Sequence, residues 1–143
     1  MSQQATGKAD VRSFLAGDTM PAGAVVTLMT APVSGQAPTV RAWLTSTSVI
    51  VGVSLSGASS TGEAIDVLLA APTVKCNVGS VDIAFGDIVG PETANAGDII
   101  TRANPTTVTT ALLPTLGIAL EAGSVSSIIE VMLMPTNQRT LSA

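Results

Sequence analysis

One pattern occurs twice in this sequence and limits what the chain can fold into. Each copy has a short aliphatic run with a central glycine, a Gly/Ser-rich turn, and a second aliphatic run followed by proline; the copies span residues 51–72 and 116–135. The central glycines are Gly52 and Gly117, which are 117 − 52 = 65 positions apart. Two such runs joined by a turn are typical of a β-hairpin, and proline cannot donate to a continuing ladder. The sequence therefore predicts two equivalent hairpins, each ended by its proline.

Strand signals continue outside the hairpins. Aliphatic runs recur between Gly- and Pro-rich turns, and no window has the 3.6-residue periodicity of an amphipathic helix. We predict an all-β chain, a small β-barrel or β-sandwich of about eight to ten short strands with internal pseudo-two-fold duplication. The expected organisation is an extended arm over residues 1–10, a single β-domain over 11–136 with half-repeats at roughly 16–72 and 86–135, and a C-terminal tail over 137–143.

Four glycines receive structural interpretations. Gly52 and Gly117 interrupt aliphatic runs, where glycine costs roughly 0.5–1 kcal/mol relative to alanine, so each indicates a bulge, a tight bend or a close backbone approach. Gly23 and Gly97 follow alanine at the start of aliphatic runs, which predicts a positive φ in the entering turn. These two turns also suggest that the likeness between the halves extends upstream. No G-x-G-x-x-G or P-loop pattern accompanies the four, so a phosphate site is not expected.

The residue types present exclude most catalytic chemistry. The chain has no histidine and one cysteine, Cys76, which rules out a Ser-His-Asp triad and any zinc site that uses histidine. Asp66 and Glu130 occupy the same place in the two hairpins and are the best case for an acid–base pair. Strand alternation instead places both on the polar face of a hairpin. We therefore predict no catalytic residue, no cofactor and no metal site, and a buried position for Cys76.

Charge argues against two classes of partner. The net charge is −4 and six basic residues are scattered without a cluster, so neither nucleic acid nor an anionic membrane surface is expected to bind. Residues 1–7 lack the apolar core of a signal peptide, and no apolar stretch approaches the ~20 residues of a membrane span. Charged residues make up only 11% of the chain. This favours either a surface covered by neighbouring molecules or an uncharged Ser/Thr-rich surface.

The repeated motifs resemble a known family. The Ala-Gly turns at residues 16–18, 22–24 and 96–98, with the hairpin runs 51–55 and 116–120, resemble tailed-phage capsid decoration (cement) proteins over roughly residues 17–135. The resemblance implies a structural virion protein that is assembled in the host cytoplasm. It would stabilise the outer surface of an icosahedral bacteriophage capsid by binding the major capsid protein, as a homotrimer. It supplies no catalytic residues.

The N-terminal arm holds the candidate contacts with a capsid. Lys8, Arg12 and Phe14 combine positive charge with an aromatic ring and are expected to touch a capsid subunit or a neighbouring trimer; an arm without contacts is the alternative. Two other functions remain open. One is a tail- or baseplate-associated β-module of a virion. The other is a soluble ligand-binding β-module, although three aromatics in all do not form a stacking platform.

Overall fold

The part of the chain that the structure describes forms ten β-strands. The structure is a computed structural model that describes residues 9–30, 35–44, 48–102 and 114–136. No helix occurs in these ranges, so none of the described residues forms a helix able to span a membrane. The all-β prediction is confirmed. The strands are β1 (Asp10–Ala16), β2 (Val25–Thr30), β3 (Thr39–Ala42), β4 (Gly52–Ser54), β5 (Ala64–Ala70), β6 (Thr73–Asn77), β7 (Ile88–Pro91), β8 (Ile99–Thr101), β9 (Thr115–Ala119) and β10 (Ile128–Thr136).

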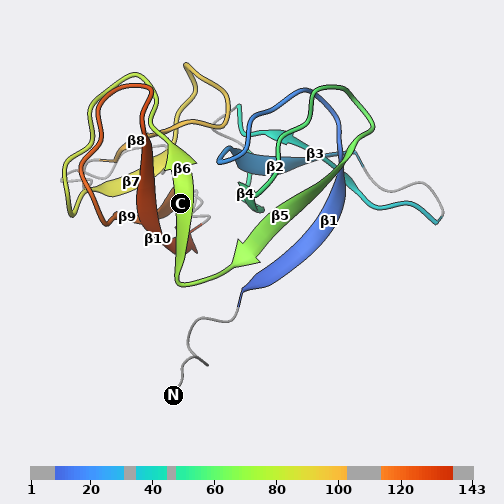
Figure 1. The fold of residues 1–143 in the computed structure, drawn as a ribbon, viewed down its shortest axis with the longest axis horizontal. Helices are drawn as coiled ribbons and strands as arrows, with labels where there is room; N and C mark the ends of the chain where they lie inside the picture. Colours follow the sequence, from blue (N-terminus) through green and yellow to red (C-terminus); the bar gives the residue numbers. More distant parts are fainter. Residues whose placement is uncertain (1–8, 31–34, 45–47, 103–113, 137–143) are drawn as a thin grey trace, which may run out of the picture.

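The first five strands close into a barrel, in the order β1-β3-β2-β4-β5. β1 and β5 form a long antiparallel pair, and β1 closes the barrel by pairing in parallel with β3, with Ala16 opposite Val40. In Figure 1 this barrel occupies the right side of the molecule. The short parallel pairing of β1 with β3 closes the sheet and so reduces the unpaired edge that an open sheet would have.

The last five strands form a second sheet with the same neighbours. Its order is β6-β10-β9-β7-β8, so every strand pairing of the barrel recurs except that of β1 with β3. A parallel bridge between Val78 and Ile99 brings β6 beside β8, as β1 lies beside β3. The N–H of Gly79 donates to Ile99 O at 2.9 Å, matching the 2.7 Å bond from Gly17 to Val40 O. The second sheet therefore rolls up in the manner of the barrel.

Strand register shows that the duplication is real. Val53 pairs with Leu68 in the β4–β5 hairpin, and Ile118 pairs with Met132 in the β9–β10 hairpin. These positions differ by 65 and 64 residues (118 − 53 and 132 − 68), the offset of the sequence repeat. The internal duplication predicted from the sequence is confirmed, because both hairpins have the same register.

Two local features differ from the sequence interpretation. The counterpart of β2 is β7, since β2 pairs with β4 and β7 with β9. The turn equivalent to Gly23 is therefore at Gly86, whose φ is +88°, rather than at Gly97. Pro135 does not end its strand, since β10 continues to Thr136, although its register with β9 shifts after Leu133. That irregularity accommodates a residue that cannot donate to the ladder.

The glycines of the hairpins lie where two backbones approach closely. A Cβ added to Gly52 would lie 2.2 Å from Leu68 O, and one added to Gly117 would lie 1.8 Å from Met132 O. Neither glycine has a positive φ, so the space required is the reason for glycine in both hairpins. Gly23 and Gly97 have φ values of +82° and +84°, the left-handed region that favours glycine.

Two apolar clusters hold the fold. The first fills the barrel and includes Phe14, Val26, Val40, Ile65 and Val67, all at most 4% exposed. The second fills the inside of the second sheet and is joined by side chains from the barrel's outer surface, which are Val25, Trp43, Ile50, Val53 and Leu68. The core is therefore continuous across the junction between barrel and second sheet.

Candidate interaction surfaces

The three residues proposed from the sequence as capsid contacts do not form one surface. Lys8 lies outside the described residues. Arg12 is exposed on β1, with its guanidinium carbon 5.6 Å from the centre of the Phe14 ring. Phe14 is only 4% exposed, in the cluster that fills the barrel. Arg12 is thus the member of the three that the structure places on the surface.

The two carboxylates that are candidates for acid–base chemistry belong to different sheets. Asp66 is on β5 of the barrel and accepts a hydrogen bond from Ser13 Oγ at 3.2 Å. Glu130 is on β10 of the second sheet, opposite Lys75 on β6. Among the described residues, no three His, Cys, Asp or Glu side chains are grouped closely enough to hold a metal ion. Cys76 is buried as expected, and burial raises the pKa of its thiol to about 12.

A buried carboxylate, Glu92, has a structural role. It is 3% exposed and accepts hydrogen bonds from Ser80 N at 3.0 Å, Ser80 Oγ at 2.6 Å and Asn95 Nδ2 at 2.7 Å. Burial raises the pKa of Asp98, and the charge of Glu92 raises it further. Burial lowers the pKa of Arg102, which donates from Nη2 to Pro91 O. These bonds fix the segment 92–98.

That segment joins the two halves of the molecule. Gly97 donates to Trp43 O at 2.9 Å and accepts from Val25 N at 2.8 Å, so it extends the hydrogen bonding at the end of β2 and β3. A Cβ on Gly97 would lie 2.9 Å from Ala24 Cβ. A second link comes from Asn77, which donates from its backbone N to Gly23 O at 3.2 Å and from Nδ2 to Ala22 O at 3.0 Å.

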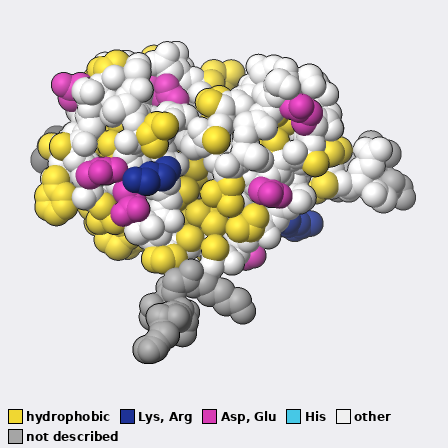
Figure 2. All heavy atoms as spheres, in the orientation of Figure 1, with side chains coloured by type: hydrophobic (Ala, Val, Ile, Leu, Met, Phe, Trp, Pro, Cys, Tyr) yellow, Lys and Arg dark blue, Asp and Glu magenta, His cyan; other side chains and the backbone are white. Residues whose placement is uncertain are grey.

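An open groove follows this junction. It is lined by residues of both halves, including Leu55, Leu68, Lys75, Asn77, Ile128 and Glu130. Two of its polar side chains already have partners, because Lys75 Nζ lies 3.4 Å from Glu121 Oε1 and Asn77 Nδ2 donates to Ala22 O. The groove is therefore a boundary between the two packed halves, and Figure 2 shows hydrophobic side chains along it.

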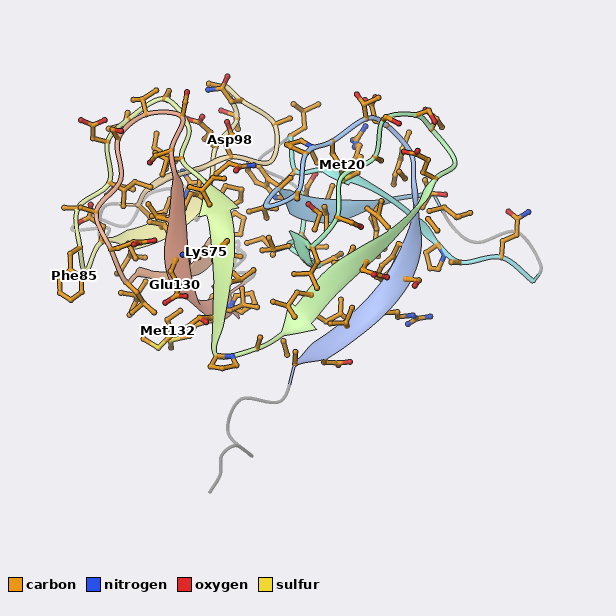
Figure 3. The ribbon with its side chains drawn as sticks, in the orientation of Figure 1. Met20, Lys75, Phe85, Asp98, Glu130 and Met132 are labelled. Atoms are coloured by element: carbon orange, nitrogen blue, oxygen red, sulfur yellow. The ribbon has the colours of Figure 1, made fainter. Side chains whose placement is uncertain are left out.

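Two strongly exposed apolar side chains of the second half of the chain are not part of the groove lining. Phe85 is 74% exposed in the turn before β7, and Met134 is 55% exposed near the end of β10. Figure 3 shows Phe85 at the left end of the molecule and Met132 at its lower left. In Figure 2 hydrophobic atoms gather over the same end. The sequence reasoning missed this surface; its signal was an aromatic residue in a Gly-Asp turn, where a polar residue is usual.

The comparisons with known proteins support the fold. No protein family matches the sequence, and no curated protein matches it. Among solved structures, the chain is similar to the head fiber gp8.5 N base of bacteriophage phi29, with a TM-score of 0.65 at 12% sequence identity. The match covers 89% of this chain and 95% of that one. At this identity the similarity is one of fold, and it extends over both the barrel and the second sheet.

Proposed function

We propose that the chain is a structural protein of a bacteriophage virion, attached to the outer surface of the head. The observation that carries the proposal is the fold similarity to a head-fiber base over 89% of this chain, at 12% identity. The duplicated hairpins that resemble capsid decoration proteins add independent support from the sequence. A fold does not by itself define a function, so the surface and the chemistry must agree with it.

The surface of the chain fits such a role. Charged residues make up 11% of the sequence, and large apolar side chains such as Leu28, Met29 and Phe85 are 52%, 47% and 74% exposed. A free monomer with so few charges exposes apolar area that an assembly would cover. We propose that the major capsid protein covers part of it and that the chain binds as a homotrimer. Several weak contacts per trimer would then add through effective concentration.

The segment before β1 is the proposed attachment arm. β1 begins at Asp10, which pairs with Ala70, so residues 1–9 can be removed without shortening the strand. We expect this deletion to reduce retention on heads while the melting temperature of the free protein stays unchanged. Arg12, which is exposed beside the arm, is expected to contribute to the same attachment. Unchanged retention would restrict attachment to the folded domain.

A tail or baseplate location is the second candidate. The fold similarity favours the head, because the similar solved structure is part of a head fiber. The soluble ligand-binding alternative has less support. Two of the three aromatic residues, Phe14 and Trp43, are 4% and 0% exposed, so Phe85 has no second exposed ring with which to form a stacking platform.

The proposed function is tested on particles of the phage that encodes the chain. Heads stripped of the protein, tailed particles and isolated tails are mixed with the purified chain, sedimented and probed for bound protein, and the complexes are imaged by cryo-electron microscopy. Saturable binding to heads and density on their outer surface are expected. Binding to tails alone would assign the chain to the second candidate, and binding to none of the three would refute a virion attachment.

A further inference from the structure

The outer surface of the barrel contains an apolar row that the second sheet covers. Val25, Val53 and Leu68 lie side by side on β2, β4 and β5, because Val25 pairs with Val53 and Val53 with Leu68. We call these three the barrel row. Although they point out of the barrel, they are 0%, 0% and 4% exposed and belong to the core that continues into the second sheet.

The second sheet carries the equivalent row. Ile88 pairs with Ile118, and Ile118 pairs with Met132, on β7, β9 and β10. We call these three the sheet row. All are apolar, like their counterparts, but each is only half-buried. Phe85 is 74% exposed and lies in the turn before β7. Its equivalent in the turn before β2 is Ala22.

One of the two elements that cover the barrel row, strand β6, has an equivalent with exposed side chains. Within the chain, β6 and segment 92–98 make the junction, through Asn77 to Gly23 and Gly97 to Val25. The counterpart of β6 is β1, since β6 pairs with β10 as β1 pairs with β5. On β1, Ser13 is exposed and Val11 is 45% exposed, although valine favours burial.

We propose that the sheet row is an interface that binds a second copy of this chain, through the β1 side of that copy's barrel. The contact between chains would repeat the contact that already exists within one chain. Each chain has two rows, the barrel row and the sheet row, and two equivalent strands that can cover a row, β6 and β1. The junction within the chain uses the barrel row and β6. One row and one covering strand remain on every free chain, and binding between copies buries both.

Such a contact is head to tail, because different surfaces of the two partners meet. A head-to-tail contact propagates, and it closes into a ring when its rotation divides a full turn. Three chains would place six similar five-stranded units around one axis. The inference therefore supplies the surface for the proposed trimer, and its ring size rests on that trimer. The contact itself is measured without capsids, so its failure is separate from a failure of head binding.

The first test uses the full-length chain in sedimentation velocity and native mass spectrometry. The wild type is expected to self-associate, and Ile118→Asp is expected to weaken the association by roughly a hundredfold, because it places a charge at the centre of an apolar interface. Val125→Asp is the matched control, since Val125 is a 48% exposed apolar residue in the turn between β9 and β10, outside the sheet row. It should leave association unchanged. Unchanged melting of both variants shows that the fold is intact.

The second test fixes the orientation. In the chain, Ala22 and Lys75 both line the junction groove, and their equivalents are Phe85 and Ser13. A Phe85→Cys, Ser13→Cys double variant is expected to give crosslinked oligomers with a short bismaleimide, whereas neither single variant should. Cys76 does not compete, because it is buried and its pKa is raised to about 12.

Three results would overturn the inference. A wild-type chain that stays monomeric at every concentration refutes the contact. Crosslinking of Phe85→Cys alone indicates a two-fold contact through the sheet row instead. If the wild type is monomeric and Ile118→Asp no longer binds heads, the sheet row contacts the capsid protein rather than a second copy of the chain.

Discussion

The barrel and the second sheet have nearly the same strand pairing, but they differ in how far their outer side chains are buried. Their hairpins have the same register, and the β-bridge between Met20 and Ala58 recurs between Ile83 and Gly123. Their outer rows differ: the barrel row is buried within the chain, and the sheet row is half-buried. Backbone pairing is therefore set within each half, whereas burial depends on what lies next to it. The paired strand residues thus build each half, whereas the outer rows determine how one five-stranded half packs against another.

The largest effect expected from this comparison concerns the two rows. Leu68→Ala should cost about 2–5 kcal/mol of unfolding free energy, because Leu68 is 4% exposed and its removal leaves a cavity at the junction. Met132→Ala, at the equivalent half-buried position, should cost roughly 1 kcal/mol or less in the monomer. Urea unfolding at low protein concentration measures both. Equal costs would mean that the two rows are equally covered within one chain.

The hairpin glycines should behave alike in both halves. Gly52→Ala and Gly117→Ala each bring a Cβ to within 2.2 Å of a backbone oxygen, so each should cost about 1–3 kcal/mol or more. Gly57→Ala is the control, because its nearest neighbour, Met20 O, would lie 3.1 Å away. Thermal unfolding compares the three. If one hairpin tolerates alanine, its strands separate more readily than those of the other.

Much of the equivalence between the two halves could be predicted from the sequence, because turns and strands depend on residues that are close together in the chain. The spacing of Gly52 and Gly117 indicated two hairpins, and β-branched runs indicated strands. The match of Gly23 with Gly97 was wrong, because it depends on the pairing of strands that are far apart in the chain. Both are left-handed glycines beside alanine, but β2 corresponds to β7, and only strand pairing decides between Gly86 and Gly97 as the equivalent turn.

The candidate surface was less predictable. The position of Phe14 near the N-terminus favours a contact arm, yet the β1–β5 register turns its side chain into the barrel, opposite Ile65. Conversely, Ile88 and Ile118 have the composition of core residues, as Val25 and Val53 do. Which row is covered depends on how the barrel and second sheet pack together, a long-range property that strand patterns do not encode.

A smaller effect comes from one backbone position. Ser126 has a φ of +67°, and its N–H donates to Val78 O; the equivalent Gly62 has a φ of +94° and donates to Ala16 O. A non-glycine residue in this region is strained, so Ser126→Gly should stabilise by about 0.5–1 kcal/mol, and Gly62→Ser should destabilise by a similar amount. Paired thermal melts test this. A loss of stability in Ser126→Gly would mean that chain entropy outweighs the strain.

The smallest expected effect is the pH dependence of one hydrogen bond in the second sheet whose equivalent in the barrel is uncharged. Glu121 Oε1 accepts from Glu130 N at 2.7 Å, while the equivalent bond in the barrel runs from Asp66 N to the neutral Ser56 Oγ at 3.1 Å. The backbone hydrogen bond from Glu130, followed by the charge of Lys75, lowers the pKa of Glu121. The bound carboxylate therefore stabilises the fold fully above the pKa of the unfolded chain. This contribution is lost as the pH falls through the lower folded pKa.

Glu121→Gln removes this contribution, and Ser56→Ala removes its uncharged counterpart. The difference in melting temperature between wild type and Glu121→Gln should be present at neutral pH and should shrink as the pH falls below the unfolded pKa, whereas the difference for Ser56→Ala should not change with pH. Glu121 is exposed, so added salt should reduce the part of its effect that comes from Lys75. A Glu121→Gln difference that persists unchanged in acid would assign the stabilisation to packing of the side chain rather than to its charge.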